Sequence, residues 1–244
     1  MSRRRSGGSR TQRAVTPAVE VTDVVKSYGE VIALEVDELV VPPGQAVVLV
    51  GHNGSGKSTL LNLVAGTLDP SEGSIKVKGR SPDSIEARAQ RSWLPDSPVL
   101  YDDLSVREHL EFTIRMHGGD GDEDVVDELI DQLGLRGRED DLPSQFSRGL
   151  RQKTAAAVAL CRPYSLLLVD EPFVGLDASG REAFLELLDD AHHAGATLMV
   201  ATHDPVVLDR FERGLVLDNG RIVHDGPASD LDSFLSADTA HRER

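Results

Sequence analysis

One stretch of eight residues constrains this chain more than any other. It runs Gly51-His52-Asn53-Gly54-Ser55-Gly56-Lys57-Ser58 and has the pattern G-x-x-x-x-G-K-S. The apolar run 46–50 precedes it, and a helix-like segment over residues 58–65 follows it. This order of strand, glycine loop and helix start is the context in which the motif binds phosphate. The stretch therefore predicts a nucleoside triphosphate ligand, and other parts of the chain have to indicate how that ligand is used.

The residue types in this loop suit a phosphate ligand. Glycines let the backbone turn tightly and keep side chains away from the ligand, so that the N–H groups of the loop and of the helix start can face the anion. Lys57 would reach the terminal phosphates, and the Ser58 hydroxyl would hold Mg²⁺. Thr59 can donate to a nearby phosphate oxygen. No role is assigned to His52. The expected ligand-binding residues of the loop are Gly51, Asn53, Gly54, Ser55, Gly56, Lys57, Ser58 and Thr59.

The composition limits the class of protein. The chain has 244 residues, of which 39% are hydrophobic, and a formal net charge of −15. That length is enough for one domain with a sizeable core. An acidic protein is a poor general binder of nucleic acid, so no specific nucleic-acid partner is expected. The single cysteine, Cys161, fits a reducing cytoplasm, and its apolar surroundings in the sequence indicate a buried, inert thiol. No apolar run approaches the ~20 residues that cross a bilayer, so we expect any role at a membrane to depend on another protein.

Apolar runs alternate with helical patterns along the chain, which predicts an α/β fold with a mainly parallel sheet between layers of helices. Residues 18–41 are β-like and should form a small antiparallel region beside that sheet. Residues 99–160 are mostly helical, and a capping box at Ser105 opens one of those helices. Further caps are expected at Ser147 and at Ser179. The sequence Asp218-Asn219-Gly220 predicts a tight hairpin turn.

Several polar residues follow predicted strands of this sheet. Asp170 and Glu171 end the apolar run 166–169, and His203 follows the run 198–201. In open α/β sheets ligands bind at the carboxyl ends of the strands, where the glycine loop also lies. Asp170 is therefore placed to take Mg²⁺, and Glu171 could act as a general base toward water. His203 could hydrogen-bond to the terminal phosphate.

A second anion site is predicted at the start of a later helix. Ser147 and Gly149 begin an alanine-rich helical segment that extends to Leu160. A serine cap and a glycine there expose a hydroxyl and backbone N–H groups. One chain thus carries two phosphate-binding helix termini, which could serve two different nucleotides if two chains face each other.

Taken together, these motifs resemble the ATP-binding subunit of an ABC (ATP-binding cassette) transporter over about residues 18–226. The resemblance implies a P-loop NTPase core with an inserted helical subdomain. It also implies that Tyr28 stacks on adenine, that Glu171 is the catalytic glutamate and that His203 is the switch histidine. The sequence Ser147-Arg148-Gly149-Leu150 is similar to the family signature, and residues 173–177 are similar to its D-loop. The cofactors implied are ATP and Mg²⁺.

The chain departs from the family pattern at two places. Arg148 and Leu150 replace Gly and Gln of the common signature, a variant that resembles exporter subunits. Asp96 occupies the position, after the predicted strand at Trp93-Leu94, where the family places Gln or sometimes Glu. Its side chain is shorter and charged, so we expect Asp96 to reach Mg²⁺ through water as both a metal and a catalytic residue.

The resemblance also divides the chain and names partners. Residues 1–17 hold five Arg and no acidic residue and are expected to be a disordered basic tail. Residues 18–226 would be the ATP-binding domain, with a helical subdomain at about 99–160, and residues 227–244 a C-terminal helix and tail. The implied partners are a second ATP-binding subunit and an integral membrane permease that the chain energises, in the direction of export. The chain would then lie at the cytoplasmic face of the cell membrane.

Two other functions remain open on the residues alone. A soluble ABC ATPase could act on nucleic acid, ribosomes or cofactor assembly. However, those that act on nucleic acid or ribosomes usually carry tandem cassettes, coiled-coil insertions or zinc-binding cysteines, whereas this chain has one cassette, no long heptads and one cysteine. A GTPase is disfavoured because the chain has no Asn-Lys-x-Asp motif that would recognise guanine.

Overall fold

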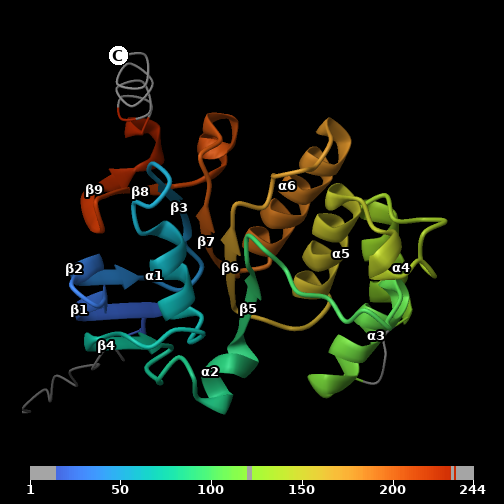
Figure 1. Ribbon diagram of the computed structural model, residues 1–244, viewed down its shortest axis with the longest axis horizontal. Helices are drawn as coiled ribbons and strands as arrows, with labels where there is room; N and C mark the ends of the chain where they lie inside the picture. The colour runs from blue at the N-terminus through green and yellow to red at the C-terminus, as the bar shows by residue number, and fades with distance from the viewer. Residues whose placement is uncertain (1–14, 120–122, 232–233, 235–244) are drawn as a thin grey trace, which may run out of the picture.

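The computed structural model describes residues 15–119, 123–231 and 234, and it consists of two sheets flanked by helices (Figure 1). Most of the tail expected over residues 1–17, and most of the C-terminal segment 227–244, lie outside the described residues. Within the described part, no helix is long and apolar enough to cross a membrane.

The larger sheet has six strands in the order β5-β6-β7-β3-β8-β9. These strands are β3 (Ala46–Val50), β5 (Arg91–Leu94), β6 (Leu166–Asp170), β7 (Thr197–Ala201), β8 (Arg213–Asp218) and β9 (Arg221–Pro227). All neighbouring pairs are parallel except β8 and β9, which form an antiparallel hairpin. Asn219 and Gly220 form its turn with φ angles of 47° and 79°, as the sequence predicts. The mainly parallel sheet is thus confirmed.

The smaller sheet is antiparallel and has the order β2-β1-β4, with β1 (Val19–Tyr28), β2 (Val31–Val41) and β4 (Glu72–Val77). The sequence indicated the first two strands. The structure adds β4 as a third strand, paired with the other edge of β1.

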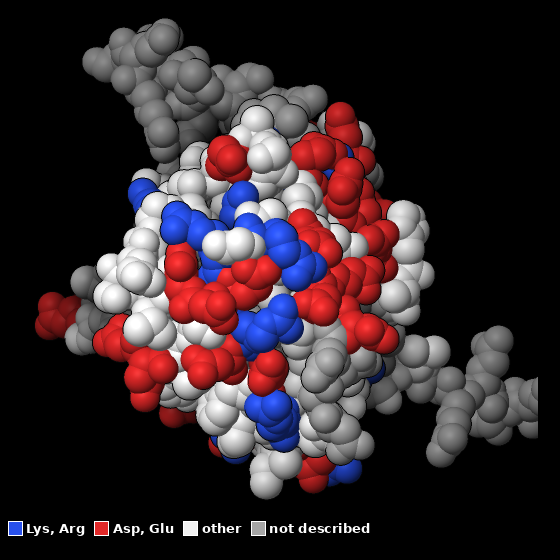
Figure 2. Space-filling model, turned by 90° about the vertical axis from the view of Figure 1, so that its right-hand side faces the viewer, with Lys and Arg blue, Asp and Glu red and all other residues white. Residues whose placement is uncertain are grey.

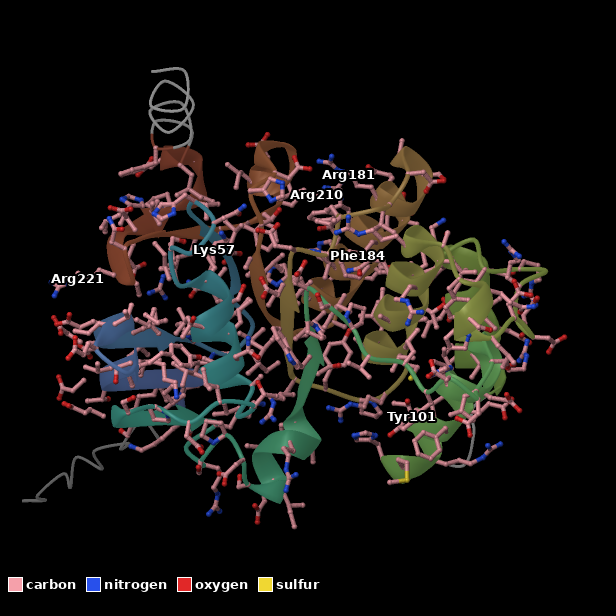
Figure 3. All side chains as sticks on the ribbon, viewed as in Figure 1. Lys57, Tyr101, Arg181, Phe184, Arg210 and Arg221 are labelled. Atoms are coloured by element: carbon pink, nitrogen blue, oxygen red, sulfur yellow. The ribbon has the colours of Figure 1, made fainter. Side chains whose placement is uncertain are left out.

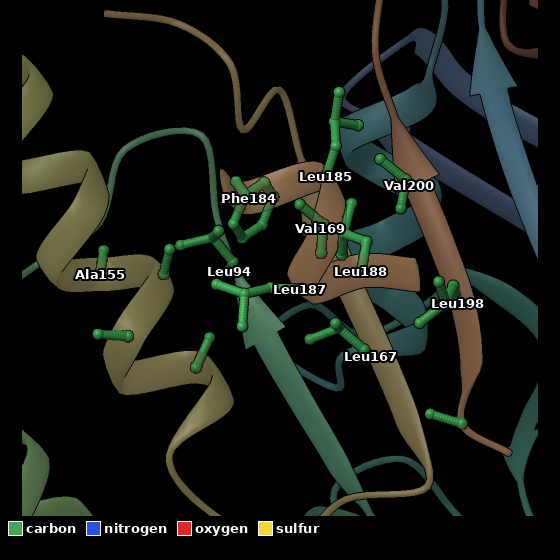
Figure 4. Close-up of a cluster of buried hydrophobic side chains, with 14 of the residues drawn as sticks. Leu94, Ala155, Leu167, Val169, Phe184, Leu185, Leu187, Leu188, Leu198 and Val200 are labelled. Atoms are coloured by element: carbon green, nitrogen blue, oxygen red, sulfur yellow. The ribbon is translucent and has the colours of Figure 1, made fainter. Parts of the chain in front are cut away.

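The core lies on both faces of the larger sheet, because successive side chains of a strand point to opposite faces. Val47 and Leu49 of β3 pack with α1 (Lys57–Val64) and the smaller sheet. Val48 and Val50 face the other way, toward a second cluster that includes residues of α5 (Arg148–Leu160) and α6 (Ala178–His193). Figure 4 shows the part of this second cluster in which Phe184 packs near β6 and β7.

Three helices, α3 (Val106–Met116), α4 (Glu123–Gln132) and α5, lie together at one side of the larger sheet (Figure 1). The remaining helical segments are α2 (Ile85–Gln90) and the 3-10 segments η1 (Pro143–Gln145), η2 (Pro205–Arg210) and η3 (Ala228–Asp230). The face at the α3–α4 side carries acidic side chains interleaved with basic ones (Figure 2). Arg107 of α3, for example, lies 2.6 Å from Asp127 of α4.

Two of the expected caps are present and one is wrong. Ser105 forms both halves of a capping box with Glu108, and the Ser147 hydroxyl accepts a hydrogen bond from the Leu150 N–H. The cap of α6 is Asp177 and not Ser179, because the Asp177 carboxylate accepts from the Gly180 N–H at 2.9 Å and Ser179 is already helical. The D-loop therefore ends in the residue that starts α6.

Candidate functional site

The carboxyl ends of β3, β6 and β7 meet at one edge of the larger sheet, and an open cavity of about 570 Å³ lies there. Five separate parts of the chain contribute to it: β2, the glycine loop with the start of α1, and the segments after β5, β6 and β7. Its lining residues are Ala33, Asn53, Gly54, Ser55, Gly56, Lys57, Ser58, Thr59, Asp96, Glu171, Val174 and His203.

The glycine loop adopts backbone angles that favour glycine. Gly54 and Gly56 have φ angles of 83° and 108°. At Gly51, an added Cβ would come within 2.2 Å of the Leu217 carbonyl oxygen, so that position has no room for a side chain. The loop thus folds back tightly against the end of β8, and its cavity side is left to backbone and small side chains.

Lys57 is 5% exposed at the start of α1 (Figure 3). Its ammonium donates to the carbonyl oxygens of Gly51 at 2.7 Å and His52 at 3.3 Å, and lies 3.8 Å from Glu171 Oε1. Burial lowers the pKa of Lys57, and the charges of Glu171 and Asp170 partly offset that effect. Among the described residues, Glu171 is the carboxylate within 4 Å of this buried ammonium, and such a cation gains from an additional anion, as a phosphate would provide.

Asp170, the last residue of β6, lies beneath the cavity and is 2% exposed. Burial raises the pKa of its carboxyl, a hydrogen bond from Ser58 lowers it, and the charges of Glu171 and Asp96 raise it further. Its Oδ1 atom has no hydrogen-bond partner among the described residues. A buried oxygen without a partner, beside a hydroxyl and a second carboxylate, suits a hard divalent cation. The residues present therefore fit Mg²⁺.

Glu171 follows directly and has a φ angle of 47°, which is strained for a residue with a side chain. Its N–H donates to the Ala201 carbonyl at 2.9 Å, and this bond fixes the turn against β7. Its Oε2 lies 2.8 Å from Nδ1 of His203, whose side chain is 67% exposed. Both residues are predicted site residues, but their direct contact is not encoded in any local pattern, because it joins the ends of two different strands.

A charged pair holds the segment that carries His203. Arg181 of α6 lies 2.6 Å from Asp204, the residue after His203. The same guanidinium is 5.5 Å from the centre of the Phe173 ring, two residues after Glu171. Figure 3 shows Arg181 and Phe184 on α6. Arg181 thus connects the segment after β6 with the segment after β7, and sequence reasoning missed this link.

The other expected site residues lie outside the cavity lining. Tyr28, at the end of β1, is 56% exposed, with the Lys26 ammonium 5.1 Å from the centre of its ring. Ser147 caps α5 at an exposed position, and Gly149 faces the Gly175 carbonyl oxygen of the D-loop. The two predicted anion sites of this chain therefore do not form one pocket within the chain.

Comparison with known proteins is consistent with this arrangement. Residues 34–174 match the model of the family described as "ABC transporter". The chain is 32% identical over 218 residues to the ABC-type transporter ATP-binding protein EcsA of Bacillus subtilis, covering 87% of this chain and 88% of that one. It is 37% identical over 206 residues to the thiamine import ATP-binding protein ThiQ of Chelativorans, covering 82% of each. With the sulfate/thiosulfate import ATP-binding protein CysA of Mycobacterium tuberculosis the identity is 36% over 239 residues, covering 91% of this chain and 68% of that one.

Solved structures also match. The ATP-binding subunit of an ABC transporter superposes with a TM-score of 0.80 and 30% identity, covering 90% of this chain and 93% of that one. A dimeric post-hydrolysis state of an ATP-binding cassette, bound to ADP and phosphate, superposes with a TM-score of 0.80 and 27% identity, covering 86% of this chain and 98% of that one. The chain belongs to the ABC transporter family, as an ATP-binding subunit that hydrolyses ATP to drive transport.

Proposed function

We propose that the cavity at the ends of β3, β6 and β7 binds the triphosphate of ATP, and that Glu171 is the general base of hydrolysis. The observation that supports this most directly is the position of the Glu171 carboxylate, between the Lys57 ammonium at 3.8 Å and the His203 ring at 2.8 Å. A phosphate bound by Lys57 would then have a carboxylate close enough to accept a proton from an attacking water.

The residues of this chain divide the work. Lys57 exchanges its bonds to the carbonyl oxygens of Gly51 and His52 for bonds to the phosphates. Glu171 accepts the proton of the water, and His203 orients the Glu171 carboxylate and donates toward the terminal phosphate. When bound, Mg²⁺ would neutralise charge on the phosphate oxygens. Ser58 and Asp170 would hold it, with Asp96 acting through water.

The remaining predicted residues would contact ATP in two other ways: at the phosphates bound by a second subunit, and at the adenine ring. Ser147 and Gly149 present the N-terminus of α5 at the surface, away from their own chain's cavity. We propose that they bind the phosphates in the partner's cavity, so that ATP closes a dimer. Tyr28, exposed at the end of β1, would stack on adenine.

We further propose that the chain energises a separate membrane permease and lies at the cytoplasmic face of the membrane. Asp102 and Asp103, in the segment before α3, are exposed and available to that partner. Reversing both charges should weaken co-purification with the permease, and unchanged binding would exclude them from the contact. The signature variant Arg148 and Leu150 favours export, whereas CysA and ThiQ are import proteins by name. Substrate flux in membrane vesicles of known orientation would decide the direction.

The general-base assignment is tested with Glu171→Gln, which keeps the size of the side chain. We expect turnover to fall by about 10²–10⁴-fold while ATP binding is retained, and the variant to accumulate as an ATP-bound dimer. Glu186→Gln, at an exposed position on α6, is the matched control and should behave as wild type. Wild-type turnover by Glu171→Gln would show that another group accepts the proton.

The permease is tested with the same variant. Tagged Glu171→Gln, recovered from detergent-solubilised membranes with ATP and Mg²⁺, should bring down a multi-spanning membrane protein in stoichiometric amount. Recovery of ribosomal or DNA-bound proteins would move the function away from the membrane.

A further inference from the structure

His52 occupies the glycine loop at a position with no assigned role, yet both nitrogens of its ring have partners. Nδ1 lies 2.8 Å from the Asn53 carbonyl oxygen, and Nε2 lies 3.0 Å from Asp218 Oδ1 at the end of β8. The other oxygen of Asp218 accepts from the Asn219 amide at 3.1 Å. The ring therefore links the loop to the β8–β9 turn.

Two backbone carbonyl oxygens of the glycine loop already have hydrogen-bond partners, and this affects how the loop can bind an anion. That of Asn53 faces the His52 ring, and that of Ser55 accepts from the Gly220 N–H at 3.0 Å, so both have partners other than Lys57, which would turn to the phosphates. A peptide whose carbonyl is held elsewhere keeps its N–H for the cavity, whereas a flipped peptide would point an oxygen at the phosphate. Asn53 and Gly54, which line the cavity, lie between the two points where the turn holds the loop.

We propose that His52, anchored by Asp218, is a positioning residue that keeps the Asn53 carbonyl away from the bound phosphates, and that it does so fully only when both ring nitrogens carry a proton. This inference rests on the proposed phosphate site. A carbonyl oxygen and an ionised carboxylate only accept hydrogen bonds, so both ring nitrogens have to donate in this geometry. A neutral imidazole has one N–H and can satisfy only one of the two.

The charged groups around the ring are of both signs. Asp218 faces it from β8, and Lys57 faces the backbone of the same residue from α1. On the far side of the turn, Arg221 of β9 is paired with Glu35 of β2. The His52 and Asp218 side chains are 35% and 50% exposed, so the contact is screened by solvent and its effect on binding should be moderate.

The test measures ATP affinity and turnover of the full chain. His52→Ala should raise the Kd and KM for ATP by about three- to fivefold while kcat stays within about twofold. Asp218→Ala should show a similar increase, and the double variant should be no weaker than His52→Ala alone, because the two residues act through one contact. His193→Ala, an exposed imidazole at the end of α6, is the matched control and should leave Kd unchanged.

The pH dependence tests the protonation step. Because the ring carries its second proton more fully at low pH, the ratio of the His52→Ala Kd to the wild-type Kd should be larger at about pH 6 than at about pH 8.5. Protonation of ATP itself affects the variant and the wild type equally, so it cancels in this ratio. A constant ratio would overturn the role of protonation. If His52→Ala bound ATP with the wild-type Kd but had a lower melting temperature, the contact would stabilise the fold without positioning the loop for phosphate, and the proposal would be wrong. Absence of ATP binding by the wild type would instead refute the phosphate site.

Discussion

Gly149→Ala offers a sharp test of how α5 packs on the D-loop, because two physical effects change the free energy of unfolding in opposite directions. Alanine favours helix over glycine by about 1 kcal/mol, so a site with open space would be stabilised. At Gly149, however, the added Cβ would lie 2.6 Å from the Gly175 carbonyl oxygen, which is backbone and cannot rotate away. An ordinary contact begins near 3.4 Å, so the start of α5 and the D-loop would have to separate by about 0.8 Å.

Overpacking of this kind costs about 1–3 kcal/mol. Set against the gain in helix propensity, the net loss should be up to about 2 kcal/mol, or a fall in Tm of up to roughly 8 °C for a chain of this size. The assay is thermal unfolding of the nucleotide-free protein, followed by ATP turnover. Turnover should also fall, because the shift moves Ser147 and the D-loop together.

Gly180→Ala is the matched control, since its Cβ would meet the ends of the Lys153 and Asp177 side chains rather than backbone. It should cost less stability than Gly149→Ala. A Tm for Gly149→Ala equal to or above that of the wild type, with normal turnover, would refute the reasoning.

Three further outcomes are expected. Burial raises the pKa of Asp170, so its ionisation opposes folding as pH rises above the usual carboxyl range; Asp170→Asn should therefore raise the Tm of the nucleotide-free chain at neutral pH, and should abolish the additional stabilisation that Mg²⁺ with ATP gives the wild type. A lower Tm at neutral pH would contradict this. Arg181→Ala should lower kcat more than it raises KM, because Arg181 holds the segment of His203; Arg181→Lys should recover part of the rate, and an unchanged kcat would exclude the role. Burial raises the pKa of Cys161 to about 12, so alkylation of this thiol at neutral pH should proceed only as fast as the protein unfolds. Rapid alkylation of the native chain would show that the thiol is accessible.

Much of the fold follows from local patterns. The residue types of Lys57 and Ser58 after a buried strand indicate the phosphate loop, and apolar runs that end in Asp170 or before His203 indicate parallel strands with polar ends. These features are set by chemistry within a few residues, so the sequence alone predicts them. Cys161 is buried, also as its apolar surroundings predict.

The rest depends on contacts between distant segments. Nothing near residues 72–77 reveals that this strand joins β1. The pattern Ser179-x-x-Glu182 resembles a capping box, yet Asp177 adopts the extended conformation and caps α6 first. The hydrogen bonds of His52 with Asp218 and of Glu171 with His203 join residues 166 and 32 positions apart, and no local pattern encodes either.

The order of strands in the smaller sheet has a consequence for the order in which this protein can be completed on the ribosome. β1 pairs with β2 through a short turn, but its other edge pairs with β4, and β3, the phosphate loop and α1 all lie between β2 and β4 in the chain. Val19, Val21 and Leu34 are fully buried only once α1 and the larger sheet cover them. The nascent hairpin therefore leaves the ribosome with an open edge and an uncovered apolar face, a period in which it is vulnerable to aggregation. Synthesis of α1 begins to cover the apolar face, but the open edge closes only when β4 follows, so the nucleotide-binding segment has to leave the ribosome before the smaller sheet can be completed.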